Sequence, residues 1–364
     1  MSGEASKGLA RFDQELAEAA MKGQWEFDRL LEGLVGGPRP AGVPHLWRWK
    51  DVNAKLLEAC DVLPESFTAR RNLAFMNPGL DRGTSHTMVM GMQMLKPGEI
   101  AWSHRHTMAA IRFVVDGSPD LVTVVDGERL PMEDNDLVLT PRWTWHDHHN
   151  GTDGNVTWLD ALDIGLVLAL NGGFYETLGE RRQPEHERSG STLANRSGDV
   201  RPTWERRKEL HVPHRYPWRD VEPILLGMAA EDGSPFDGIV LEYVNPITGG
   251  HTMPTISCWI QMLRPGERTR PHRQTSSGMY HVVRGAGTTT VDGVDLEWTD
   301  RDCFVIPNWA EHSFVNRSTT EEAILFSVHD IPTLEALGLY YETPEPSLGV
   351  APWPAVPADV TRPR

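Results

Sequence analysis

The chain has 364 residues, of which 39% are hydrophobic and 24% charged, and its formal net charge is −16. Such an acidic surface repels nucleic acid and anionic membranes, so we expect neither as a partner. The sequence contains no apolar run of about 18 residues and begins without the apolar core of a signal peptide, so we expect no membrane span. Its three scattered cysteines form no CxxC pair, which favours the reducing cytoplasm.

The first predicted elements form a helical arm. Phe12, Leu16 and Ala19 share one face of a predicted helix. A Gly- and Pro-rich stretch at residues 36–44 ends this run, and a second segment with large apolar anchors follows it. We therefore predict a helical N-terminal arm over residues 1–60 that packs on a neighbouring domain or subunit, with a simple surface helix as the alternative.

From about Thr84 the pattern changes to short apolar strands separated by Gly, Pro and Asp turns. The Asp-Gly pair at residues 126–127 is a strong hairpin signal. A polar stretch rich in Arg and Ser then separates two strand series. We predict an N-terminal barrel over residues 61–178, a connection over 179–215, a C-terminal barrel over 216–340 and a Pro-rich tail over 341–364.

The two strand series are copies of one unit. Pro97-Gly98-Glu99 matches Pro265-Gly266-Glu267, His104 matches His272, and His146 matches His312, all at an offset of roughly 167 residues. A repeat of this kind predicts a duplicated all-β unit, and its short strands with Gly and Pro turns indicate two jelly-roll barrels.

Three histidines of the first copy predict a metal site. His104 and His106 are two residues apart on a predicted strand, so their side chains point to the same face. His146 follows the predicted hairpin, on a strand that returns against the first. Three imidazoles gathered in this way suit a first-row transition metal.

Longer stretches identify a family. "PGEIAWSHRHTMAAIRFVVDG" and "DLVLTPRWTWHDHHN" resemble the two cupin motifs, so the chain resembles a bicupin. With "RRNLAFMNPGL" and "WLDALDI", it resembles more narrowly the gentisate 1,2-dioxygenase family, which includes salicylate and 1-hydroxy-2-naphthoate dioxygenases.

The resemblance implies an all-β bicupin with a helical N-terminal arm and one Fe(II) per chain, held by His104, His106 and His146 in the N-terminal barrel. It implies a small aromatic 2-hydroxy acid and dioxygen as partners, with ring opening between the carbons that bear the carboxylate and the hydroxyl. It also implies a homo-oligomer, a tetramer in this family. The alternatives are a non-oxidative Mn or Fe bicupin enzyme and a non-catalytic bicupin binding protein.

Many cupins add a glutamate to three histidine ligands, but the stretch after His106 contains no carboxylate. Three neutral ligands would leave positions open for a substrate that chelates through carboxylate and phenolate. Arg112 stands nearby in the sequence and is predicted to grip the substrate carboxylate with its forked guanidinium.

Further candidates surround this centre. The resemblance implies that His148 hydrogen-bonds a substrate oxygen or moves a proton, and Asp160 is predicted to orient it. Gln93 could contact the substrate, and either Arg70 or Arg71 could reach the site. A structural role stays open for each of these residues.

The run "HTMVMGMQ" at residues 86–93 bears on substrate choice, because gentisate enzymes typically have a run like "NTLWAALQ" there. Val89 takes the place of the tryptophan and Gly91 that of an alanine, and both changes remove bulk. A glycine within a strand often permits close approach of a ligand. The pocket is therefore predicted to accept salicylate, halo- or nitrosalicylates such as 5-nitrosalicylate, or 1-hydroxy-2-naphthoate, with gentisate as the alternative.

The second copy differs at the metal-ligand positions. Gln274 replaces the second histidine of the motif, and Tyr280 aligns with Arg112. We expect the C-terminal barrel to be metal-free. A weak second site formed by His272, His281 and His312 is the alternative.

Overall fold

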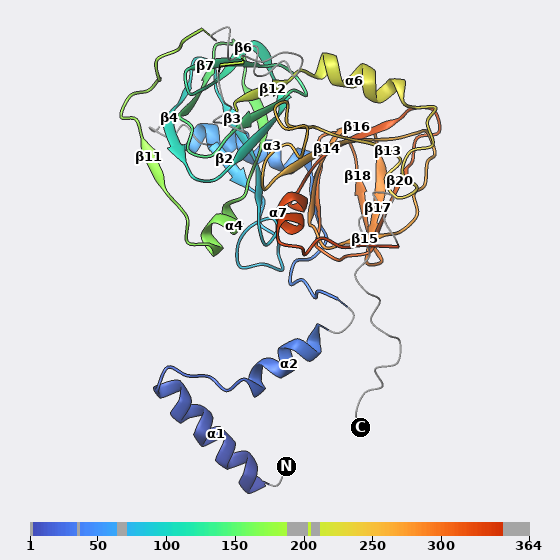
Figure 1. Cartoon of the computed structure of the whole chain (residues 1–364). Helices are drawn as coiled ribbons and strands as arrows, with labels where there is room; N and C mark the ends of the chain where they lie inside the picture. Colours follow the sequence, from blue (N-terminus) through green and yellow to red (C-terminus); the bar gives the residue numbers. More distant parts are fainter. Residues whose placement is uncertain (1–2, 35–36, 64–70, 188–202, 205–211, 345–364) are drawn as a thin grey trace. The chain divides into compact units, whose positions relative to one another are not determined.

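The structure is a computed structural model that describes residues 3–34, 37–63, 71–187, 203–204 and 212–344. Arg70, the predicted tail beyond residue 344 and most of the predicted connection lie outside the described residues. The chain separates into two compact units, Met1–Pro40 and Ala41–Arg364. The first unit contains α1 (Gly3–Glu18) and α2 (Trp25–Gly33) (Figure 1).

The N-terminal barrel is built from two sheets (Figure 1). The first contains, in spatial order, β12 (His214–Tyr216), β8 (Leu137–Thr140), β5 (Ala110–Asp116), β10 (Val156–Leu162), β3 (Val89–Leu95) and β2 (Arg71–Ala74). The second contains β11 (Tyr175–Thr177), β4 (Ile100–His106), β9 (His146–Asn150), β6 (Ser118–Val125) and β7 (Glu128–Met132). Helix α4 (Ile164–Ala169) follows β10. The predicted hairpin turn joins β6 to β7, with positive φ angles of 45° at Asp126 and 79° at Gly127.

The C-terminal barrel repeats this plan. Its larger sheet contains β1 (His45–Trp47), β19 (Cys303–Ile306), β16 (Gly278–Arg284), β21 (Ala323–His329), β14 (Ser257–Leu263) and β13 (Ile239–Glu242). Opposite it are β18 (Val294–Trp298), β17 (Gly287–Val291) and β20 (His312–Asn316), with the pair β15 (Arg273–Gln274) and β22 (Glu342–Thr343). Helix α7 (Ile331–Ala336) follows β21. The predicted all-β duplicated fold is confirmed, whereas the predicted domain bounds stay predictions.

The segment that precedes each barrel in the sequence contributes one strand to the other barrel. Strand β1 pairs with β19 of the C-terminal barrel, and the following helix α3 (Trp49–Val62) packs on β2 and β3 of the N-terminal barrel. Strand β12 pairs with β8 of the N-terminal barrel, and the following helix α6 (Trp218–Gly227) packs on β13 and β14. The sequences "HLWRWKD" and "HRYPWRD" that begin these segments are themselves copies. The duplicated unit therefore includes a strand and a helix before each barrel.

Two buried aspartates anchor the exchanged segments. Asp302 accepts hydrogen bonds from the backbone N–H of Trp49 at 2.8 Å and from Arg48 at 3.0 Å. At the equivalent place in the N-terminal barrel, Asp136 accepts hydrogen bonds from the backbone N–H of Trp218 at 2.8 Å and from Arg215 at 2.6 Å. An equivalent aspartate thus anchors the start of a helix in each copy of the unit.

The two barrels share one hydrophobic core. Phe113 of β5 stacks on Phe326 of β21, with ring centroids 4.1 Å apart. Two reciprocal hydrogen bonds flank this core. The hydroxyl of Thr87 donates to Asp330 at 2.6 Å, and that of Thr255 donates to Asp163 at 2.5 Å. Each barrel therefore fixes the other in place. None of the helices in the described residues has the length and apolar composition needed to cross a membrane.

Candidate metal centre and substrate site

Three imidazoles meet inside the N-terminal barrel. His104 and His106 point to the same face of β4, and β4 pairs with β9 in a register that sets His104 opposite His146. The ring centroids of His146 and the other two lie 4.1 and 4.8 Å apart. All three side chains are buried, and their nearest ligand atoms lie within 4.8 Å of one another. The described part of the chain holds no other group of three such side chains gathered this closely.

Backbone carbonyls orient these imidazoles. In each of the three histidines, Nδ1 lies close to the carbonyl oxygen of a residue two positions away. The distance is 2.8 Å for His104 and 2.9 Å for both His106 and His146. When Nδ1 donates in this way, Nε2 is left as the ligand atom. Burial, reinforced by neighbouring cationic groups with His104 first, holds the pKa of His146 well below its ordinary value. In the part of the chain that the structure describes, Nε2 of His146 is buried without a hydrogen-bond partner, so the donor set fits a transition-metal ion.

A buried ion pair lies on the sheet that faces the imidazoles. Strands β5 and β10 pair so that Arg112 stands opposite Asp160, and Arg112 Nε lies 3.4 Å from Asp160 Oδ1. Arg112 Nη1 donates to the hydroxyl of Thr140. Asp160 in turn accepts hydrogen bonds from Trp158 Nε1 at 3.1 Å and from Asn72 Nδ2 at 2.7 Å. The ion pair of Arg112 and Asp160 is thereby held by groups from β8, β10 and β2.

Asn72 is a member of this network that the sequence analysis missed. Paired residues in antiparallel strands point to the same face, and β2 pairs with β3 so that Asn72 stands opposite Gln93. Gln93 in turn stands opposite Trp158, which lies in the interior core of the barrel. Asn72 therefore faces the interior. Side chains alternate between the two faces along the strand "RRNLAF". This alternation predicts an inward Asn72 only when Arg71 is known to point outward.

Arg71 lies on the other face of the same strand. It pairs with Met94, which belongs to the core between the barrels, and its guanidinium forms a bidentate ion pair with Glu99, one contact measuring 2.7 Å. Glu99 also accepts a hydrogen bond from the backbone N–H of Lys96 at 2.7 Å. The glutamate of the Pro-Gly-Glu motif thus fastens its own turn and the start of β2. The contact of Arg71 with Glu99 is that of a structural salt bridge, and a contact of Arg71 with the substrate stays a prediction.

Gln93 and Val89 occupy the interior face of β3. The side-chain amide nitrogen of Gln93 is buried and makes no hydrogen bond within the described residues, so it has a donor to offer. Val89 is half-buried at the beginning of the strand, opposite Leu162. Their contacts with a substrate stay predictions.

Gly91 has a packing role that the sequence did not reveal. A Cβ at this position would lie 2.6 Å from the carbonyl oxygen of Leu73 and 2.7 Å from the side-chain oxygen of Asn72. The glycine therefore lets strand β2 approach closely. Its effect on substrate choice stays a prediction, and the structure provides a route for it, because Asn72 holds Asp160.

His148 shares the inward face of β9 with His146, and their ring centroids lie 6.0 Å apart. It is buried, and its ring lies 5.2 Å from that of Trp158. The predicted proton-transfer role of His148 and its predicted orientation by Asp160 stay predictions. The contacts described for Asp160 link it to Arg112 and its neighbours.

The alternative prediction was a weak second metal site formed by His272, His281 and His312, and the structure does not bring these three histidines together. His272 and His312 lie together, with ring centroids 4.3 Å apart. His281, however, points to the opposite face of β16 from Tyr280, into the core between the barrels. There its ring lies 5.8 Å from that of Phe113, and its Nδ1 is 3.5 Å from the sulfur of Cys303. The idea that His281 completes a site with the other two is therefore wrong.

Comparison with known proteins agrees with this architecture. A family model described as "Cupin domain" matches residues 91–162 and 259–329, one stretch in each barrel. Two cupin domains in one chain, the first with a buried three-histidine centre, define a bicupin suited to metal binding.

Similar proteins of known activity indicate which kind of bicupin the chain is. The chain is 48% identical to a 1-hydroxy-2-naphthoate 1,2-dioxygenase from a Nocardioides species, over 98% of this chain and 92% of the relative. It is 41% identical to a 5-aminosalicylate 1,2-dioxygenase from a Comamonas species, over 92% and 90% of the two chains. A crystal structure of salicylate 1,2-dioxygenase from Pseudoaminobacter salicylatoxidans with gentisate superposes with a TM-score of 0.81, at 30% identity over 92% and 93% of the chains. The chain belongs to this family of ring-cleaving 1,2-dioxygenases.

Proposed function

We propose that the protein is an Fe(II)-dependent dioxygenase that opens the ring of an aromatic 2-hydroxy acid between the carbon bearing the carboxylate and the carbon bearing the hydroxyl. The observation that supports this most directly is the buried centre of His104, His106 and His146, with no carboxylate ligand among the three. Bound there, Fe(II) would bring a chelating substrate and dioxygen together and pass electron density between them.

The surrounding residues bind and orient the substrate in this proposal. Arg112 offers its guanidinium to the substrate carboxylate, and Asp160 holds that guanidinium in place. The unpaired amide nitrogen of Gln93 donates to a substrate oxygen, and His148 hydrogen-bonds the phenolate or takes its proton. Because these groups are buried, their charges are weakly screened and act strongly on a bound anion.

For the substrate, we propose 1-hydroxy-2-naphthoate ahead of the single-ring salicylates. The relative that shares 48% of its residues with this chain bears that activity in its name. Val89 is smaller than the tryptophan expected from the gentisate pattern, which favours a larger ring system. The Fe(II) identity, a homo-oligomeric state and a cytoplasmic location belong to the same proposal.

The test is dioxygen uptake by anaerobically prepared, Fe(II)-loaded protein. The substrates are 1-hydroxy-2-naphthoate, salicylate, 5-nitrosalicylate, 5-chlorosalicylate and gentisate. We expect one dioxygen consumed per ring, with loss of the aromatic absorbance, and the highest kcat/KM for the bicyclic acid. His104→Ala should abolish uptake, while the exposed His186→Ala should not change it. Gentisate far ahead would overturn the substrate proposal, and no uptake with any ring would overturn the dioxygenase proposal.

A further inference from the structure

The C-terminal barrel has lost the features that receive an aromatic acid in the first barrel. Trp259 of β14 stands opposite Ser327, in the register that pairs Gly91 with Asp160 in the N-terminal barrel. Tyr280 takes the place of Arg112 and stacks on Phe304 with ring centroids 4.8 Å apart. Bulkier and apolar side chains therefore stand at these two positions of the C-terminal barrel.

Two histidines of the C-terminal barrel keep the spacing of their counterparts in the N-terminal barrel. The ring centroids of His272 and His312 lie 4.3 Å apart, against 4.1 Å for His104 and His146. His312 Nδ1 lies 3.0 Å from the carbonyl oxygen of Ala310, as the equivalent nitrogen does in the first barrel. His312 Nε2 is buried and has no hydrogen-bond partner among the described residues. A buried imidazole nitrogen without a partner is costly unless something binds it.

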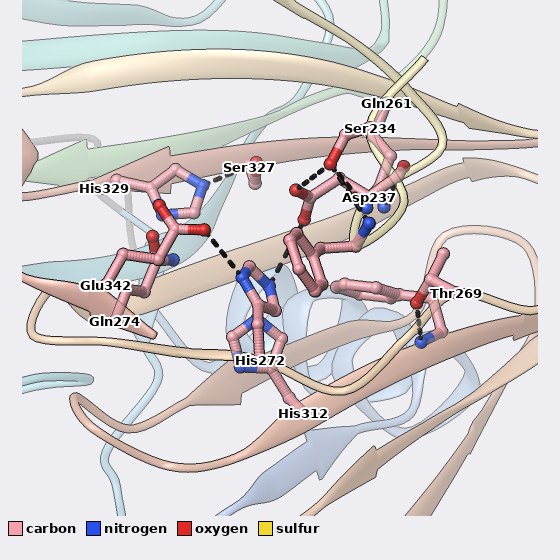
Figure 2. A network of polar contacts seen from close by, with 12 residues as sticks. Ser234, Asp237, Gln261, Thr269, His272, Gln274, His312, Ser327, His329 and Glu342 are labelled. Carbon is pink, nitrogen blue, oxygen red and sulfur yellow. Dashed lines mark hydrogen bonds and ion pairs between the residues drawn. The ribbon is translucent and has the colours of Figure 1, made fainter. Parts of the chain in front are cut away.

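His272 lies between two carboxylates, as Figure 2 shows. Its Nδ1 is 3.0 Å from Glu342 Oε1, and its Nε2 is 3.5 Å from Asp237 Oδ1. The first contact is the one that metal-bound histidines commonly make with a carboxylate behind them. The second is longer than a hydrogen bond, but two ligand atoms on one tetrahedral ion at bonds of about 2.0–2.1 Å are roughly 3.4 Å apart.

Asp237 is held beside His272 by its own contacts. Its Oδ2 accepts a hydrogen bond from the hydroxyl of Ser234 at 3.0 Å, and its carbonyl oxygen accepts one from Gln261 Nε2 at 2.8 Å (Figure 2). Its side chain and those of His272 and Glu342 line a cleft of about 410 Å³. An ion therefore has a route to this cluster.

We propose that the C-terminal barrel binds a divalent transition-metal ion through His272 Nε2, His312 Nε2 and the carboxylate of Asp237, with Glu342 supporting His272 from behind. Two imidazoles and one carboxylate form a ligand set used for both Zn²⁺ and Fe²⁺. Within the described residues only the N-terminal triad has all its donor atoms within 4.8 Å, so binding here must bring the three donor atoms closer together. The second ion is therefore held more weakly than the first.

The test is titration of the metal-free, full-length protein with Co²⁺, followed by its visible absorption and by elemental analysis after desalting. We expect two equivalents to bind the unchanged protein, the second with a weaker Kd. The variant His104→Gln/His106→Gln removes the first site and should retain one equivalent. This readout is independent of dioxygenase activity.

Adding Asp237→Asn to that double variant keeps the shape of the side chain but removes its charge, and should weaken the remaining site at least tenfold. The matched control is His329→Gln, a buried histidine of the same barrel that bonds Ser327 and lies outside the ligand set; it should keep the equivalent. A single equivalent in the unchanged protein and none in the double variant would overturn the proposal. Equal binding with and without Asp237→Asn would also overturn it.

Discussion

Asn72 links strand β2 to the proposed substrate site through its hydrogen bond to Asp160. A hydrogen bond to a buried charged group contributes about 1.5–3 kcal/mol, and the position of Arg112 depends on Asp160. We therefore expect Asn72→Ala to lower kcat/KM roughly tenfold to a hundredfold, mainly through a higher KM for the aromatic acid. Steady-state kinetics with the preferred substrate measure this.

The same variant should keep its full metal content, because Asn72 contacts none of the three histidines in the contacts described for it. Elemental analysis provides that control. If KM were unchanged, Asn72 would have no positioning role, and its contact with Asp160 would serve stability alone.

His281 predicts a pH effect that is separate from the site. Burial first, and then the charge of Arg301, lower the pKa of His281 to about 3. In the unfolded chain this histidine takes up a proton below pH 6.5, whereas in the folded protein it stays neutral until about pH 3. Its contribution to stability is therefore lost as the pH falls below 6.5.

The change His281→Phe copies the residue at the equivalent position of the first barrel, Phe113. Between pH 7 and pH 5 the unchanged protein should lose about 2 kcal/mol more of its unfolding free energy than the variant. Urea denaturation at the two pH values measures this. An equal loss in both proteins would show that His281 does not titrate on unfolding as described.

The cluster of three histidines could be predicted from the sequence because the i, i+2 spacing and the repeated motif are local. Asn72 was missed because its role depends on the register between β2 and β3, which no local pattern specifies. His281 was misplaced for a different reason. Its neighbour Tyr280 had been aligned with the inward-facing Arg112, and alternation along the strand already sends His281 outward.

At the scale of elements, the strands exchanged between the barrels are β1 and β12, and the segments that contain them are anchored by Asp302 and Asp136. Each carboxylate accepts a hydrogen bond from a backbone N–H at the start of a helix and forms an ion pair with an arginine. We expect Asp302→Asn to lower the free energy of unfolding by about 1.5–3 kcal/mol, because a buried charge-assisted contact is lost. Asp136→Asn should have a similar effect, measured by urea denaturation.

The control is Asp220→Asn, an exposed carboxylate on α6, whose loss should change stability by less than about 0.5 kcal/mol. Unequal effects of the two buried changes would mean that the exchanged segments are not equivalent. From the sequence alone, residues 45–60 belong to the predicted arm, because strand pairing across a long separation leaves no periodic signal. The copy of "HLWRW" as "HRYPW" was the available clue.

At the scale of the whole molecule, one core joins the barrels through the stack of Phe113 on Phe326. Phe113→Ala removes a fully buried ring and should cost about 3–5 kcal/mol. Because the barrels share this core, the unchanged protein should unfold in a single transition in urea. Tryptophan fluorescence and far-UV circular dichroism should report the same midpoint, and two separated transitions would contradict a shared core.

The central claim is that the protein inserts both atoms of dioxygen into an aromatic ring. The most direct test is a rapidly quenched reaction of Fe(II)-loaded protein with 1-hydroxy-2-naphthoate under isotopically labelled dioxygen, followed by mass spectrometry of the product. The account predicts a ring-opened product that carries two labelled oxygen atoms. A product with one labelled atom or none, or an intact ring, would contradict it.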